Sequence, residues 1–296
     1  MITASINSTT SQTQRHWLLR YKWLILRRTS QFSILSLFIL SPMTDSWFIK
    51  GNLSSSLVLN SIPLTDPYLL IQSFFAGHSV TATVLIGTAI VSLFYLTVGG
   101  RVYCSWVCPV NIATDTAGWL RRKLKIKSAS LFIKSTRYWL LGISFLLAFI
   151  SGTLAWELVN PVTIIQRGLI SGLWISALLL LVIFIFDLFM SRDAWCGHIC
   201  PVGAFYSLFG RFGFVRISAY NRQDCDDCMD CYSVCPEQQV IKPVLKNTDN
   251  SPVITGINCT NCGRCIDVCD KNVFKVTNRF NHSTTSNEFH SQESFQ

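Results

Sequence analysis

The chain has 296 residues, of which 50% are hydrophobic and only 14% are charged, and its formal net charge is +9. Soluble domains carry about 25% charged residues, so this composition predicts a membrane protein. The positive charge does not indicate nucleic-acid binding, because no nucleic-acid motif accompanies it and basic residues in membrane proteins usually set topology. The twelve cysteines fall in four clusters, which excludes the scattered cysteines of a secreted disulfide protein.

The first 30 residues are polar and then basic, and they predict a cytoplasmic N-terminal arm. Four apolar segments follow, and each approaches the ~20 residues that a helix needs to cross a ~30 Å hydrocarbon core. These predicted spans cover residues 31–49, 79–98, 138–156 and 169–186. The sequence therefore predicts a mainly α fold, with a polytopic four-helix membrane bundle over residues 31–190.

The distribution of lysine and arginine predicts the orientation of this bundle. The N-terminal arm carries 5 of them, the loop 99–137 carries 8 and the tail after residue 190 carries 10, whereas the loops 50–78 and 157–168 carry one each. The positive-inside rule then places both termini on the cytoplasmic side of a bacterial inner membrane. Thiols stay reduced in that compartment, as cluster ligation requires.

Two short motifs share the pattern aromatic-Cys-x3-Cys-Pro-Val and begin 92 residues apart, at Tyr103 and Trp195. Each follows a predicted helical hairpin, so the membrane domain is predicted to repeat one hairpin twice, with the second motif in a cytoplasmic linker of residues 191–220. Cysteines at positions i and i+4 share one helix face, and the following proline breaks or turns that helix. The motifs supply four candidate redox or metal-binding thiols: Cys104, Cys108, Cys196 and Cys200. Buried cysteines that merely shape the cytoplasmic mouth are the alternative.

Residues 221–275 contain two runs with the spacing Cys-x2-Cys-x2-Cys-x3-Cys, followed by a tail, 276–296, that is predicted to be disordered. In bacterial ferredoxins with this spacing, three thiolates of one run and the fourth of the other hold one [4Fe–4S] cluster. The predicted ligands of the first cluster are Cys225, Cys228, Cys231 and Cys269. Those of the second cluster are Cys259, Cys262, Cys265 and Cys235. Two identical registers disfavour a disulfide knot or a zinc ribbon.

The four spans, the Cys-x3-Cys-Pro motifs after the second and fourth spans, and the C-terminal pair of cysteine runs together resemble the NapH family over residues 25–275. The resemblance implies a membrane iron–sulfur subunit of the periplasmic nitrate reductase system that acts as a quinol dehydrogenase. It also implies quinol as the substrate, the membrane quinol pool as its source and a NapG-like iron–sulfur protein as the partner. NosR-like proteins share the cysteine plan, but this chain lacks their large periplasmic flavin-binding region.

The sequence is also compatible with two other functions, because a fold constrains function loosely. One is a membrane metal reductase in oxidase assembly, with copper bound by the Cys-x3-Cys-Pro thiols. The other is a membrane anchor or maturation protein, similar to NosR in plan, that recruits a cytoplasmic ferredoxin-like partner. The catalytic residues stay unassigned; ionisable residues at the edges of spans are candidates for a quinol pocket. These are His78, Asp187, Asp193 and His198.

Overall fold

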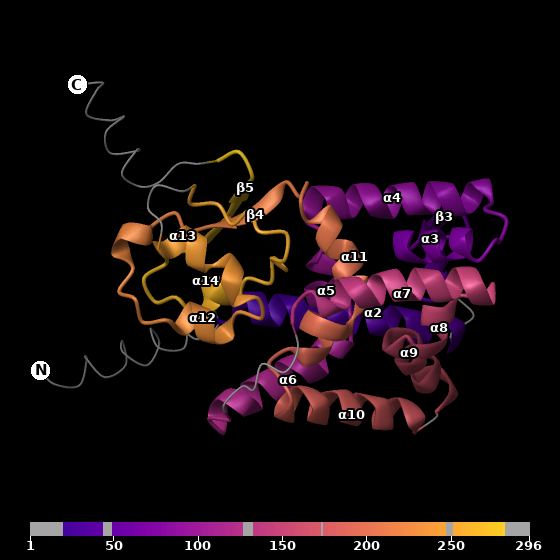
Figure 1. The fold of residues 1–296 in the computed structure, drawn as a ribbon, viewed down its shortest axis with the longest axis horizontal. Helices are drawn as coiled ribbons and strands as arrows, with labels where there is room; N and C mark the ends of the chain where they lie inside the picture. Colours follow the sequence, from indigo (N-terminus) through magenta and orange to yellow (C-terminus); the bar gives the residue numbers. More distant parts are fainter. Residues whose placement is uncertain (1–19, 44–48, 127–132, 173, 247–250, 282–296) are drawn as a thin grey trace, which may run out of the picture. The chain divides into compact units, whose positions relative to one another are not determined.

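The computed structural model describes residues 20–43, 49–126, 133–172, 174–246 and 251–281 (Figure 1). The chain separates into two compact units. The helical unit consists of Ser30–Phe214 and Gly256–Thr260, and the cysteine-rich unit consists of Met1–Thr29, Val215–Thr255 and Asn261–Gln296. The prediction of a mainly α protein is confirmed.

Four apolar helices overlap the four predicted spans, although their bounds differ. They are α2 (Lys22–Met43), α4 (Ala82–Val98), α7 (Thr136–Ser151) and α10 (Ile175–Phe189). Among the described helices, only α2, over Lys22–Leu40, is both long and apolar enough to cross a membrane, and the other three are shorter apolar helices. The four-span bundle therefore stays a prediction.

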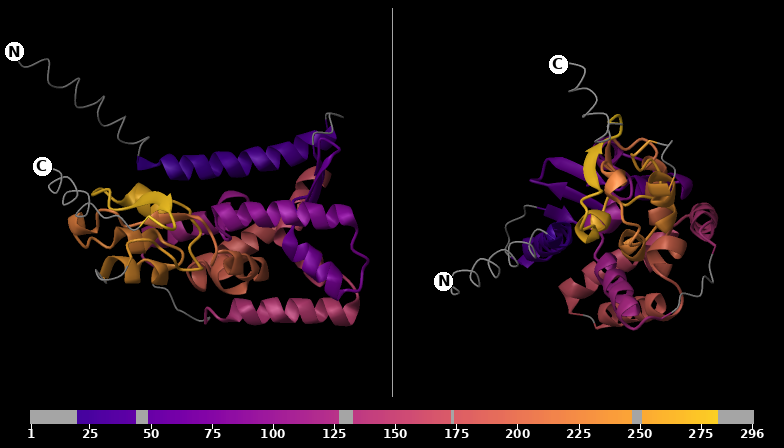
Figure 2. Two further views of the ribbon diagram at one scale, coloured as in Figure 1. Left: turned by 90° about the horizontal axis from the view of Figure 1, so that it is seen from above. Right: turned by 90° about the vertical axis from the view of Figure 1, so that its left-hand side faces the viewer.

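The first span was predicted to begin at residue 31, but α2 begins at Lys22 and runs unbroken through the basic residues (Figure 2). Arg27 is only 1% exposed, so this part of the chain is not the solvated basic flank that the sequence suggested. The start of α2 is capped within the cysteine-rich unit. The Asp267 carboxylate accepts hydrogen bonds from the backbone N–H groups of Trp23 and Leu24, at 3.2 and 2.9 Å, which satisfies two first-turn donors.

The segment between α2 and α4 folds into the helical unit. Strands β1 (Ile49–Gly51), β2 (Ser55–Val58) and β3 (Ile62–Thr65) form an antiparallel sheet, which leads into α3 (Pro67–Phe75). Asp66 caps α3 and Pro67 occupies its first turn, the usual start of a helix. Helix α3 packs against both α4 and α7, between which it lies in Figures 1 and 2.

The two predicted hairpin repeats have similar local structure. The first motif forms α5 (Val102–Trp106) and leads into α6 (Val110–Lys123); the second forms a π-helical turn, η1 (Trp195–Ile199), and leads into α11 (Pro201–Phe209). A new helix begins at or directly after each motif proline, because proline fits the first turn of a helix but not its interior. Helices α8 (Ala155–Val159) and α9 (Pro161–Ser171) connect α7 to α10.

Residues 191–220 were predicted to be a linker, and this was wrong. The ring of Tyr206 on α11 is 1% exposed and stacks on Tyr103, 5.1 Å between ring centroids, with Tyr95 at 4.9 Å. The linker prediction rested on sequence position after the last apolar span, whereas the aromatic side chains of α11 belong to the main core of the helical unit.

The cysteine-rich unit contains a two-stranded antiparallel sheet of β4 (Val215–Ser218) and β5 (Lys275–Asn278). Its helices are α12 (Asp230–Val234), α13 (Lys242–Lys246) and α14 (Arg264–Val268), with 3-10 turns η2 (Arg222–Asp224) and η3 (Gln238–Val240). Disorder was predicted from residue 276, but residues 276–278 pair with β4. The rest of the predicted tail, 282–296, lies outside the described residues.

Candidate iron-sulfur sites

The first ferredoxin-type run folds around a cavity in the cysteine-rich unit. Four thiols that the spacing groups together, those of Cys225, Cys228, Cys231 and Cys269, line this cavity, which encloses about 370 Å³ of space, part of it open to solvent. Buried Val273 and Phe274 form part of its apolar wall. A cubane needs four thiolates around one volume, so this set of four cysteines fits a [4Fe–4S] cluster.

The backbone of the two runs repeats in detail. The second residue after the first cysteine and the residue after the second cysteine are left-handed in both runs, at Asp227 and Met229 and at Asn261 and Gly263. A five-residue helix then follows, α12 in the first run and α14 in the second, and the two helices pack together. Left-handed residues turn successive backbone segments toward a common centre, so both runs have the loop that a cluster requires.

The fourth cysteine of each run leaves its helix. Cys235 ends α12 and Cys269 ends α14, and both have extended backbone. This conformation is compatible with a side chain that serves the other run's site, as Cys269 does by lining the first cavity. The predicted second ligand set stays a prediction, because Cys259 lies in the segment Gly256–Thr260, which belongs to the helical unit.

Among the described residues, no group of three or more His, Cys, Asp or Glu side chains could hold a single metal ion. A cubane does not require such a group, because each of its four thiolates binds a different iron atom.

The second constellation lies in the helical unit, where the thiols of Cys104, Cys108, Cys196 and Cys200 line one cavity that encloses about 600 Å³ of space, part of it open to solvent. The structure thus brings both motifs to one place. Burial raises the pKa of Cys200 to about 12 and raises that of Cys196 well above its ordinary value. Four such thiols can stay ionised together only beside positive charge, which a metal or an iron–sulfur cluster would supply.

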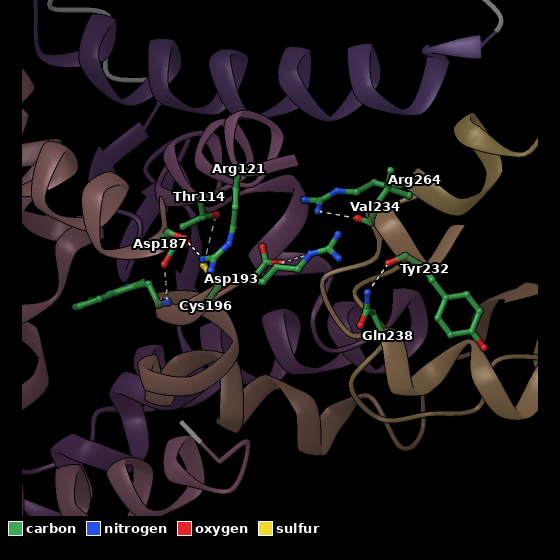
Figure 3. A network of polar contacts seen from close by, with 11 residues as sticks. Thr114, Arg121, Asp187, Asp193, Cys196, Tyr232, Val234, Gln238 and Arg264 are labelled. Carbon is green, nitrogen blue, oxygen red and sulfur yellow. Dashed lines mark hydrogen bonds and ion pairs between the residues drawn. The ribbon is translucent and has the colours of Figure 1, made fainter. Parts of the chain in front are cut away.

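The turn that carries Cys196 is fixed by α10 and α6. The Asp187 carboxylate accepts a 2.8 Å hydrogen bond from the backbone N–H of Trp195, and Arg121 donates to the Asp187 carbonyl oxygen at 3.1 Å (Figure 3). The hydroxyl of Thr114 lies 3.9 Å from the Cys196 sulfur (Figure 3). Asp187 therefore positions a thiol motif, and this structural role explains the presence of an ionisable residue here without a role in quinol binding.

Figure 3 also shows that Arg264 donates to the carbonyl oxygen of Val234 at 3.4 Å, within the cysteine-rich unit.

Two buried arginines connect the second motif to the segment that precedes Cys259. Arg101 donates to the carbonyl oxygens of Cys196 and Asn258, at 3.3 and 3.1 Å. Arg137 donates to the carbonyl oxygen of Gly197 at 3.2 Å and to Asn258 Oδ1 at 2.7 Å. Both guanidinium groups thus join the thiol motif to the segment Gly256–Thr260, all within the helical unit.

The thiol-lined cavity also reaches residues that the sequence analysis missed. Asp66 and Glu157 line it together with the aromatic side chains of Tyr68 and Trp156. The candidates chosen from the sequence, His78, Asp187, Asp193 and His198, do not line it. The sequence signal for Asp66 was the Asp66-Pro67 pair, which is typical of a helix start. This signal indicates a helix between the first two spans, but it does not show which cavity the helix faces.

Comparison with known proteins agrees with this geometry. Residues 80–127 and 172–218 both match a 4Fe-4S binding domain, and the two matches begin 92 residues apart, as the two motifs do. Residues 224–273 match a 4Fe-4S dicluster domain. The fold and these sites together define an iron–sulfur protein of the ferredoxin type.

Similar proteins cover nearly the whole chain. The chain is 46% identical to the ferredoxin-type protein NapH of Haemophilus influenzae, over 90% of this chain and 93% of that protein. It is 42% identical to NapH of Escherichia coli (92% and 95%) and 51% identical to the methylamine utilization ferredoxin-type protein MauN of Paracoccus denitrificans (90% and 94%). The chain therefore belongs to the family of ferredoxin-type proteins that includes NapH and MauN. No solved structure matches it.

Proposed function

We propose that the protein is a membrane-bound electron-transfer component that oxidises quinol and passes the electrons on through two [4Fe–4S] clusters. With a NapG-like iron–sulfur partner, it delivers them toward a periplasmic nitrate reductase. The observation that carries the proposal is the cavity lined by Cys225, Cys228, Cys231 and Cys269, because thiols from both runs meet there as in a two-cluster ferredoxin.

Membrane insertion is supported by the surface of the apolar helices. Large apolar side chains on α4, α7 and α10 are more than half exposed, including Leu93 at 65%, Phe149 at 69% and Phe189 at 63%. Soluble proteins rarely expose contiguous apolar surface of this kind, whereas lipid would cover it. With α2, these helices form the proposed membrane domain, with both termini and the clusters in the cytoplasm.

A bound [4Fe–4S] cluster would accept and release one electron at a time, which suits a two-electron donor that must be oxidised in single steps. The chain's own residues supply position and shielding. Cys231 is buried, and the buried side chains of Val273 and Phe274 form an apolar part of the wall of the first cavity. The charge of Asp267 is opposed by the N-terminal end of α2, which reduces the effect of this carboxylate on the potential of a bound cluster.

A second candidate function rests on the similarity to MauN, whose name assigns it to methylamine utilization. The same electron-transfer chemistry would then serve that process instead of nitrate reduction. A third possibility is copper reduction at the Cys-x3-Cys-Pro thiols, which line one cavity. Metal analysis separates it: copper that disappears when Cys104, Cys108, Cys196 and Cys200 are all changed to Ser favours the reductase.

The test of the main proposal is anaerobic reduction of the purified full-length protein by quinol, in the presence of its iron–sulfur partner. Menaquinol and ubiquinol should be tried separately, because their potentials differ. We expect the visible absorbance of the clusters to bleach with at least one of them. If dithionite bleaches the clusters but neither quinol does, the quinol dehydrogenase function is refuted, although the iron–sulfur assignment stands.

A further inference from the structure

The wall of the cavity in the helical unit contains two carboxylates in addition to the four thiols. Asp66 comes from the N-terminus of α3, and Glu157 comes from α8. Both carboxylates line the same cavity as the four thiols of the two motifs. Aromatic side chains of Tyr68 and Trp156 form part of the wall. A flat ring with polar groups on its rim would find both an apolar wall and polar partners there.

Hydrogen bonds hold each carboxylate in a defined place. Asp66 Oδ1 accepts from the backbone N–H of Tyr68 at 2.9 Å and from the hydroxyl of Tyr206 at 3.0 Å. Glu157 accepts from the hydroxyl of Thr163 at 2.7 Å and, through its other oxygen, from Ser54 at 3.3 Å. These bonds orient the carboxylates without neutralising them.

Neither carboxylate forms a salt bridge with any residue that the structure describes. Both residues are partly buried, and a carboxylate that is partly removed from water without a cation is costly; such groups concentrate at functional sites. Burial is the main reason that the pKa of Asp66 rises to about 6, and the negative charge of Glu157 adds to it. The other titratable groups that face Asp66 are Tyr68, Tyr95, Tyr103 and Tyr206. This raised pKa allows Asp66 to exchange a proton near neutral pH.

Resting on the quinol oxidation proposed above, we propose that this cavity is the quinol-binding site and that Asp66 and Glu157 accept the two protons of the quinol. The two O–H bonds of the quinol break, one proton passes to each carboxylate, and a quinone remains. The two electrons leave singly to iron–sulfur centres of the protein, which are reduced. Placement of the carboxylates beside the thiols gives protons and electrons separate exits from one site.

A purely structural role for Asp66 is separable from this one. Asparagine caps helices as well as aspartate does and can still accept the hydrogen bond of Tyr206 through its Oδ1. Asp66→Asn should therefore keep α3 in place while it removes the proton acceptor. Trp156 provides a second position at which the site can be tested, because its Nε1 is buried and has no hydrogen-bond partner within the described part of the chain. It is a donor available to a bound quinol or quinone.

The kinetic test uses the full-length protein and follows quinol-driven bleaching of the cluster absorbance. Removal of a proton acceptor typically costs 10²–10⁴-fold, so we expect Asp66→Asn and Glu157→Gln each to slow bleaching at least about tenfold. Dithionite should bleach both variants as it bleaches the unchanged protein. Asp115→Asn on α6, outside the cavity lining, is the matched control and should keep its rate. Rates within twofold of the unchanged protein in both cavity variants would overturn the proposal.

A binding test keeps the site assignment independent of turnover. The probe is 2-heptyl-4-hydroxyquinoline N-oxide, a quinol analogue whose fluorescence is quenched when it binds. Trp156→Phe should weaken its binding at least about threefold, whereas Trp139→Phe, at an α7 side chain that is 75% exposed, should not. Equal binding by both variants would overturn the location. If quinol fails to bleach even the unchanged protein while the probe binding still depends on Trp156, the function fails but the site stands.

Discussion

The guanidinium of Arg137 donates a 2.7 Å hydrogen bond to Asn258 Oδ1, one residue before the first cysteine of the second ferredoxin-type run. It also donates a hydrogen bond to the carbonyl oxygen of Gly197, inside the second thiol motif. Arg137 is fully buried, so the two groups are joined through a cation that solvent does not reach. The segment that carries Cys259 thus depends on the helical unit for its position.

Replacement of Arg137 by lysine tests this dependence. A single ammonium group lacks the planar fork that reaches two acceptors, so Asn258 and the second motif should lose their common anchor. We expect iron and acid-labile sulfide to fall by about four atoms per chain, because the second cluster is lost and the first is kept. Arg167→Lys, at an exposed position on α9, is the control. Unchanged iron in Arg137→Lys would show that the anchor is dispensable.

Tyr206→Phe should move the pH dependence of quinol oxidation. Asp66 must be ionised to accept a proton, so the rate should rise with pH through its pKa of about 6. The hydroxyl of Tyr206 stabilises the ionised form, and such a bond is worth roughly 1.5 kcal/mol, or about one pH unit. Its loss should shift the rising limb to higher pH by that amount. A pH profile of quinol-driven bleaching measures the shift; no shift, or one to lower pH, contradicts the role of Asp66.

The same carboxylate predicts a direction for stability. Because burial raises the pKa of Asp66 from 3.8 to about 6, the folded state binds its proton more tightly than the unfolded state does. The contribution of Asp66 therefore favours folding below about pH 4 and is lost as pH rises through 6. Unfolding of the unchanged protein and of Asp66→Asn at pH 5 and pH 7 should show this pH-dependent difference between them. A difference that does not change with pH would contradict the raised pKa.

Gly263→Ala should destabilise the cysteine-rich unit. Gly263 has a φ of +72°, and an added Cβ would lie 2.5 Å from the Trp23 ring. Left-handed backbone with a side chain costs about 1 kcal/mol or more before the clash is counted. Thermal loss of cluster absorbance should therefore occur at lower temperature. Gly142→Ala on α7, where the Cβ meets nothing within 4 Å, is the matched control and should be neutral or stabilising.

The sequence predicted the parts of the site that depend on local spacing. Cys225, Cys228 and Cys231 lie within one short loop, so their convergence follows from the chain itself, and Cys269 joined them as the ferredoxin pattern requires. Recurrence of the Cys-x3-Cys-Pro motif likewise predicted two similar turns. The structure places both at one cavity.

What the sequence could not predict depends on packing between distant segments. Asp66 and Glu157 lie 91 residues apart and meet only because α3 packs against α7, which leads into α8. The distribution of lysine and arginine assigned both residues to loops outside the bundle, because it reflects which side of the membrane a loop lies on and not how deeply its residues are buried. The buried position of Arg27 and the core role of Tyr206 were missed for the same reason: their partners are far away in sequence.

The most direct test of the central claim is the iron and acid-labile sulfide content of the anaerobically purified full-length protein, measured beside Cys228→Ser and Ser233→Ala. We predict at least about eight irons and eight sulfides per chain in the unchanged protein and in Ser233→Ala, and about four fewer of each in Cys228→Ser. Colourless protein without labile sulfide, or identical contents in all three, would contradict the assignment of the cysteine runs as iron–sulfur sites.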